Sequence, residues 1–219
     1  MNFVLERVNQ PEIEPVTLAQ MKTHLREFTG VTTYDTDITN LIIAAREWVE
    51  DYTGRALIDQ VWRLTISNGA LISGDAVKGY MVPGYYCGTF RPTYFGEILL
   101  RKSPILAITS FKSVNAAGVE TAVDAATYEL RDADSKWPKL FGLSGATWVS
   151  GTFRITFRAG YANRDGTPQE GAEVVPVRLI QAMKLWAEAM YDRDEKMMPI
   201  LLETAESIAR PERCELGMA

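Results

Sequence analysis

The sequence contains few of the residues from which disulfide-stapled or zinc-bound folds are built. Its 219 residues include only two cysteines, Cys87 and Cys214, and no C-x-x-C spacing. A disulfide framework and a structural zinc site are therefore not expected. Because 47% of the residues are hydrophobic, the chain has enough apolar material to close a core without such cross-links.

Long hydrophobic runs and an excess of basic residues are also missing. The longest apolar runs, such as NLIIAA, are far shorter than the roughly 20 residues that cross a bilayer. The first residues carry acidic groups where a signal peptide has its apolar segment, so we expect a soluble protein of a cytoplasm-like compartment. The net charge of −5 has the wrong sign for a protein that binds nucleic acid through its phosphates.

Catalytic motifs are missing as well. The only histidine, His24, lies among charged residues in KTHLRE and is interpreted as a surface or rim residue. The sequence contains no H-E-x-x-H, Walker or G-x-G-x-x-G motif. Its acidic clusters alternate with basic residues, as on ordinary solvated helix faces. We therefore predict no catalytic, cofactor-binding or metal site, with a paired-carboxylate hydrolase as a distant alternative.

Two helices are predicted before residue 58. In PVTLAQMKTHLREF, Thr17 is suited to the N-cap and Gln20 to the reciprocal bond of a capping box. The second helix, ITNLIIAAREWVEDYTGRAL, has apolar residues at i, i+3, i+4 and i+7, and Gly54 is placed to end it. Its apolar stripe consists of Ile38, Leu41, Ile42, Ala45, Trp48, Val49 and Tyr52.

After Leu57 the hydrophobic period changes from about 3.6 to 2. Alternating segments at QVWRLTIS, EILLR, ITSFKSV, TYELR and TFRITFRAGY predict a small antiparallel β unit. The tetrapeptide NAAG, residues 115–118, is typical of a hairpin turn. Residues 68–96 show no sustained period but contain aromatics, prolines and glycines, so we interpret them as a long extended arm.

Helical periodicity returns at VPVRLIQAMKLWAEAMYDRDEK, where Pro176 suits the first turn. Pro199 is expected to break this pattern, and a short amphipathic helix is expected to follow and to stop before Pro211. Because the apolar stripes before and after the β region both need burial, the helices bearing Trp48 and Trp186 are expected to pack together.

The predicted fold is therefore α+β. The expected organisation is a helical bundle from residues 1–57 and 174–209, an inserted β unit from residues 58–173 that includes the arm 68–96, and a flexible tail at 210–219.

In this order, the segments resemble the head-tail connector (adaptor) proteins of tailed bacteriophages, the group with a β insert in a helical bundle. The resemblance covers most of residues 16–195 outside the arm, and its most specific part is AAREWVEDYTGRAL, residues 44–57. It implies a structural virion protein and not an enzyme. Such proteins form a ring, commonly of twelve subunits, below the portal; the ring extends the DNA channel and joins the head to the neck or tail.

The resemblance also implies where the protein acts and with what. We expect it in the virion neck, and in the host cytoplasm during assembly, with the portal protein and a neck or tail-completion protein as partners. DNA is expected to pass through the lumen without specific binding, and neither a membrane nor a cofactor is implied. The competing interpretation is a head-closure or tail-completion protein of the phage neck.

Candidate contact residues follow from the same resemblance. The C-terminal segment is expected to reach towards the portal, unless its short helix folds back on its own bundle. The portal-docking candidates are Leu201, Leu202, Ala205 and Ile208. The candidates for a subunit or tail-side interface are the aromatics Tyr85, Tyr86, Phe90, Tyr94 and Phe95 of the arm and the charged Arg46, Glu47, Glu50 and Asp51 of the second helix. A stacking platform for single-stranded nucleic acid is the alternative use of the arm, but Lys78 and Arg91 supply little charge for it.

Overall fold

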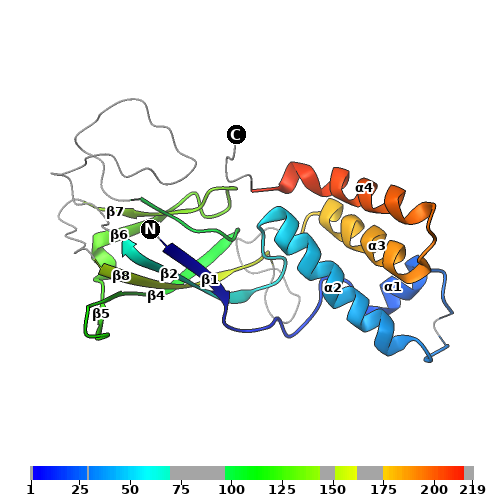
Figure 1. Ribbon diagram of the computed structural model, residues 1–219, viewed down its shortest axis with the longest axis horizontal. Coiled ribbons are helices and arrows are strands. Elements are labelled where there is room, and N and C mark those ends of the chain that lie inside the picture. Colours follow the sequence, from blue (N-terminus) through cyan, green and yellow to red (C-terminus); the bar gives the residue numbers. More distant parts are fainter. Residues whose placement is uncertain (1, 29, 70–96, 144–150, 162–174, 215–219) are drawn as a thin grey trace. The chain divides into compact units, whose positions relative to one another are not determined.

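The computed structural model of the protein describes residues 2–28, 30–69, 97–143, 151–161 and 175–214 (Figure 1). These residues belong to two compact units. The β unit draws on residues 1–10 and 60–159, and the helical unit on residues 11–59 and 160–214. The fold is α+β, as the sequence predicts.

The β unit is built from two antiparallel sheets. The larger has the strand order β1-β2-β8-β4-β5, and the smaller has the order β3-β7-β6. The strands of the larger sheet are β1 (Asn2–Arg7), β2 (Gln60–Gly69), β4 (Ile105–Val114), β5 (Glu120–Ala122) and β8 (Gly151–Ala159). Those of the smaller are β3 (Glu97–Leu99), β6 (Tyr128–Arg131) and β7 (Lys139–Gly142).

The alternation predicted for the central strands is present in the larger sheet. Leu64 of β2 lies opposite Ile155 of β8, and both side chains are buried. The neighbouring pair, Arg63 and Thr156, occupies the other face of the sheet. The buried face of the larger sheet includes Trp62, Leu64, Ile66, Phe111, Phe153, Ile155 and Phe157.

The hairpin predicted at NAAG connects β4 and β5. Gly118 has φ of +80°, and the Asn115 side chain accepts hydrogen bonds from the N–H groups of Ala117 (3.0 Å) and Val119 (2.9 Å). This side chain therefore closes the turn that the glycine permits.

Three strands were not predicted, namely β1, β5 and β7. The first of them changes the organisation, because residues 2–7 pair with β2 in the β unit, whereas the sequence interpretation placed residues 1–57 with the helices. β5 and β7 are only three and four residues long.

The helical unit contains α1 (Leu18–His24), α2 (Asp35–Thr53), α3 (Val177–Asp192) and α4 (Met197–Ala209). The capping box of Thr17 and Gln20 is formed, and Gly54 ends α2 in the left-handed conformation. Pro199 differs from its predicted role: it lies inside the first turn of α4, where its missing N–H removes no intrahelical bond. No helix among the described residues is long and apolar enough to cross a membrane.

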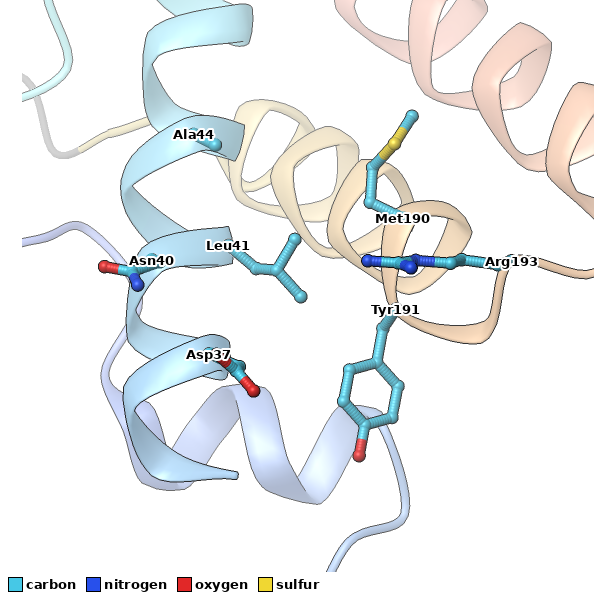
Figure 2. A pocket seen from close by; sticks show the side chains of 7 residues that line it. All are labelled: Asp37, Asn40, Leu41, Ala44, Met190, Tyr191 and Arg193. Carbon is cyan, nitrogen blue, oxygen red and sulfur yellow. The ribbon is translucent and has the colours of Figure 1, made fainter. Parts of the chain in front are cut away.

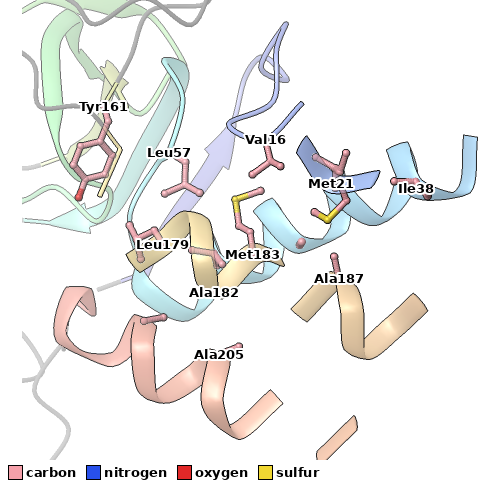
Figure 3. Close-up of a cluster of buried hydrophobic side chains, with 14 residues drawn as sticks. Val16, Met21, Ile38, Leu57, Tyr161, Leu179, Ala182, Met183, Ala187 and Ala205 are labelled. Carbon is pink, nitrogen blue, oxygen red and sulfur yellow. The ribbon is translucent and has the colours of Figure 1, made fainter. Parts of the chain in front are cut away.

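The core of the helical unit forms where α2 and α3 pack together, as predicted (Figure 3). The rings of Trp48 and Trp186 stack with their centroids 6.1 Å apart. Alanines allow the helices to approach closely in this core. The buried alanines are Ala45, Ala182, Ala187, Ala205 and Ala209.

Residues 210–214 are fixed to the helical unit, although a flexible tail was expected from residue 210. The Arg55 side chain donates from Nε to the carbonyl oxygen of Glu212 (2.8 Å) and pairs with its carboxylate (3.2 Å). The N–H of Cys214 donates to the carbonyl oxygen of Thr53 (2.7 Å). The remaining residues of that tail, 215–219, lie outside the described residues.

Candidate functional site

The charged side of α2, proposed from the sequence as an interface, is partly internal. Arg46 is 1% exposed and Glu50 is 2% exposed, so neither is available to a neighbouring subunit in this conformation. Arg46 donates to Glu14 (2.8 Å) and to Glu50 (2.9 Å), and the second oxygen of Glu50 accepts the N–H of Leu57 (2.9 Å). These two residues therefore link α2 to the segments before and after it.

Burial and neighbouring charges shift the pKa values of Glu14 and Arg46 in this cluster. Desolvation raises the pKa of Glu14 above its ordinary value, outweighing the opposite effect of the Arg46 guanidinium. Desolvation acts to lower the pKa of Arg46, but the carboxylates of Glu50 and Glu14 together raise it. Arg46 is thus held in its charged form inside the unit.

The other two charged candidates on α2 remain near the surface. Asp51 is exposed, and the side chain of Glu47 is 42% exposed, with an oxygen 3.8 Å from Arg46. Of the four charged residues proposed from the sequence, these two are still placed to meet a partner.

The four portal-docking candidates on α4 also differ in how deeply they are buried. Ala205 is completely buried, and Ile208 packs against the core of the helical unit. Leu201 and Leu202 are half-buried. In this structure α4 folds back on its own bundle, which is the alternative that the sequence left open. The exposed apolar residues of α4 are Met197 and Ile200, with Ile200 55% exposed.

The aromatic candidates of the arm, Tyr85, Tyr86, Phe90, Tyr94 and Phe95, lie outside the described residues. His24 is partly buried, with Nε2 3.0 Å from a carboxylate oxygen of Glu188 on α3, so it forms part of the contact between α1 and α3. Within the described residues, no group of three or more His, Cys, Asp and Glu side chains is placed to hold a metal ion.

A surface that the sequence interpretation missed lies in the connection between α1 and α2. Phe28 is 80% exposed there, and Val31 and Tyr34 are exposed as well. Phe28 continues the helical spacing of Met21 and Leu25, but α1 ends at His24, so Phe28 lies beyond the helix whose apolar stripe it would have joined. The 80% exposure of a phenylalanine is the signal that identifies the surface.

A groove lies between the first half of α2 and the end of α3 (Figure 2). Its volume is about 490 Å³. Leu41, Ala44 and Met190 supply its apolar lining, while Asp37 and Arg193 bring opposite charges to it. Its full lining is Asp37, Asn40, Leu41, Ala44, Met190, Tyr191 and Arg193.

One wall of the groove is held by a hydrogen bond from Tyr191 to Glu27, with an O···O distance of 2.8 Å. This bond to a carboxylate is the main cause that raises the pKa of Tyr191 to about 12. Glu27 immediately precedes Phe28, so the same contact also fixes the start of the exposed connection.

Replacing Glu27 by glutamine is expected to lower the pKa of Tyr191 towards the ordinary value of 10, because the anionic acceptor is removed. Since the folded state holds this phenol proton more tightly than the unfolded state, the stabilisation is present below pH 10 and is lost as the pH rises to about 12. Tyrosinate absorbance during an alkaline titration measures the change. The Tyr191→Phe variant identifies the relevant signal, and an unchanged titration in Glu27→Gln would contradict the assignment.

The described residues thus combine an α+β fold with exposed apolar surfaces of the kind that assembly requires. No family model matches the chain, and no curated protein matches it. Several solved structures are similar to the chain. A chain from the neck of an empty GTA particle, computed with C6 symmetry, is 25% identical with a TM-score of 0.68, and the match covers 96% of this chain and 95% of that one.

Two further solved structures are similar over nearly the whole chain. One is a chain of the virion of a native gene transfer agent (GTA) particle, at 24% identity and a TM-score of 0.67, with 95% of this chain and 94% of that one covered. The other is from the neck of a native GTA particle computed with C12 symmetry, at 23% identity and a TM-score of 0.63, with 96% and 94% covered. All three chains come from GTA particles, and the fold is that of a phage-like neck protein.

Proposed function

We propose that the protein is a head-tail connector, a structural virion protein that forms a ring below the portal and joins the head to the neck or tail. The observation that carries this proposal is the match to a neck chain over 96% of this sequence, which leaves no large part of the chain for a separate activity. The order of helical and β segments, from which the sequence alone suggested a connector, supports it independently.

The ring is proposed to contain twelve subunits. Necks that contain similar chains were computed with C12 and with C6 symmetry, and both are compatible with twelve copies around one axis. A net charge of −5 suits a wall along which DNA slides without adhering. The protein would be found in the virion neck, and in the host cytoplasm during assembly.

The portal contact is proposed to involve the exposed side of α4. Leu201 and Leu202 stay in this proposal because they are half-buried, and Met197 and Ile200 join them because they are exposed. Ala205 and Ile208 would reach a portal only if α4 left its bundle, since both now pack in the core of the helical unit.

Replacing Ile200 by glutamate is expected to weaken binding to portal-bearing heads by about tenfold or more, because a charge would enter an apolar contact. Ile200 is 55% exposed, so the free protein should keep its stability. Binding is measured by co-sedimentation of the purified chain with filled heads. The matched control is Val119→Glu, at a position 57% exposed in the β unit.

An equal loss of head binding in Ile200→Glu and Val119→Glu would contradict a role of α4 in the portal contact. Point substitutions are preferable to deleting the segment from Met197 onwards, because a deletion would also remove the buried Ala205 and Ala209 and the bond of Cys214 to Thr53.

Electron microscopy of the neck in intact particles tests the wider assignment. A connector would occupy the layer directly below the portal, whereas a head-closure or tail-completion protein would occupy a later layer. A position away from the portal-tail axis would overturn the assignment to the neck.

A further inference from the structure

The α1–α2 connection presents three apolar side chains, Phe28, Val31 and Tyr34, which we name the knob. All three are exposed, Phe28 to 80%. Leaving a phenylalanine in water forgoes about 1.5–3 kcal/mol that its burial would provide. An aromatic residue placed this way is the type that most often anchors a protein interface.

A buried lysine holds the backbone of the knob at Val31. Lys22 is only 4% exposed; its ammonium group donates to the carbonyl oxygen of Val31 (2.6 Å) and pairs with the carboxylate of Asp35. Before Phe28 in the sequence, the carboxylate of Glu27 accepts a hydrogen bond from the hydroxyl of Tyr191. Because Glu27 and Val31, on either side of Phe28 in the sequence, are held before any partner arrives, docking of Phe28 would cost less conformational entropy than docking of an untethered residue.

The groove between α2 and α3 has the chemistry to receive this knob. Its lining from Leu41, Ala44 and Met190 is apolar, and at about 490 Å³ it falls in the size range of pockets that enclose small organic groups. Met190 is unbranched and adapts to the shape of an aromatic ring. Tyr191 is kept at the wall by Glu27, so the groove is formed in advance.

One pair of charges beside the two surfaces is complementary, although the groove also carries Arg193. Arg26 is exposed two residues before Phe28, and Asp37 is exposed at the groove. Within the described part of the chain neither has an ion-pair partner, so each is available to the other across a contact. Such pairs at the rim contribute to orientation and to the rate of encounter more than to affinity.

We infer that Phe28 of one subunit inserts into the α2–α3 groove of the next copy of this chain, and that this contact closes the ring. A second copy is the occupant because the similar neck chains come from assemblies with sixfold and twelvefold symmetry. A knob and a groove on each subunit make a head-to-tail interface, which generates a ring when the rotation closes. Both surfaces belong to the helical unit. The inference rests on the proposed function as a ring.

Cross-linking of two single-cysteine variants tests the contact. Both start from the full chain with Cys87→Ser and Cys214→Ser. Gly30→Cys marks the knob and keeps Phe28, and a Cβ at that glycine meets no atom within 4 Å. Asn40→Cys marks the groove and keeps its apolar lining. The mixture is treated with a short bismaleimide, and covalent dimers are followed over time.

Dimers are expected to form at least about tenfold faster in this mixture than in a control mixture of Val119→Cys with Asn40→Cys, and adding Phe28→Ser to the knob variant should abolish the difference. Equal rates in the two mixtures would overturn the inference. Faster linking of Gly30→Cys to itself would overturn it as well, because knob would then meet knob.

The same variants, assembled into particles, separate this inference from the proposed function. A neck that contains the chain as a ring but lacks the knob-to-groove link leaves the function standing and refutes the contact. A cross-linked oligomer of a chain that is absent from the neck upholds the contact and refutes the function.

Discussion

Replacing Arg46 by methionine is expected to lower the free energy of unfolding by about 3–5 kcal/mol, the usual cost of removing one partner of a buried ion pair. Arg46 is 1% exposed, and its guanidinium bonds the carboxylates of Glu14 and Glu50. Methionine replaces the aliphatic part of the side chain without its charge, so the loss reports mainly the missing ion pairs, with a smaller contribution from the space that the guanidinium filled. Urea unfolding followed by tryptophan fluorescence measures it.

The control for this change is neutralisation of the acidic partners. Adding Glu14→Gln and Glu50→Gln to Arg46→Met should recover most of the loss, because no buried charge is left unpaired and the new amide oxygen at position 50 can still accept the N–H of Leu57. The surface control is Glu47→Gln, whose side chain is 42% exposed and which should change stability by less than about 0.5 kcal/mol. A loss in Arg46→Met no larger than in this control would contradict the argument.

The loss should also depend on pH. The pKa of Glu14 is already raised above 4.5 in the folded protein, so the folded state binds the proton more tightly and stability from this group falls as the pH rises past 4.5. The Arg46 guanidinium acts to lower the pKa of Glu14, so this pKa is expected to rise further in Arg46→Met. The cost of Arg46→Met is therefore expected to be smaller near pH 4.5 than at neutral pH.

The helical core could be predicted because its signal is local. The stripes of α2 and α3 repeat at helical spacing, and the stacking of Trp48 on Trp186 follows once both stripes must be buried. The capping box at Thr17 and the left-handed Gly54 are equally local, since each depends on a few adjacent residues. The turn at NAAG belongs to the same group.

The burial of Arg46 and Glu50 could not be predicted from spacing. Both lie on the side of α2 that carries the charged residues, and their partners come from outside the helix. Glu14 is 32 residues away from Arg46 in sequence, and no periodic pattern links the two. A helical wheel assigns a charged side to water unless another segment of the chain covers it.

Distance in sequence also hides the first strand and the candidate contact surfaces. β1 is only six residues long and pairs with β2, about sixty residues later, so its place in the sheet depends on a long-range register. Phe28 lies beyond the end of α1 at His24, and Leu41 and Met190 of the groove continue the apolar stripes of α2 and α3. The apolar stripes of α2 and α3 are wider than the contact between these two helices, and the part that this contact leaves uncovered lines the groove.

Among the glycines whose surroundings the structure describes, Gly160 is expected to give the largest effect when replaced by alanine, a loss of more than about 3 kcal/mol in the free energy of unfolding. A Cβ at this position would overlap the carbonyl carbon and oxygen of Ile58 and lie 2.5 Å from the backbone nitrogen of Asp59. Backbone atoms cannot rotate away as a flexible side chain can. The adjacent Tyr161 is 1% exposed and donates its N–H to the carbonyl oxygen of Leu57, so any shift would disturb the core.

Two other glycines separate the clash from the conformational cost. Gly160 has φ of +148° and Gly118 has φ of +80°, but a Cβ at Gly118 meets no atom within 4 Å. Gly118→Ala should therefore cost only about 1–2 kcal/mol, the penalty of a left-handed alanine. Gly30 is open and has no positive φ, so Gly30→Ala should be nearly neutral. The urea concentrations at the midpoints of unfolding rank the three variants by stability. A loss of stability in Gly160→Ala no greater than in Gly118→Ala would show that the backbone beside Ile58 can move aside.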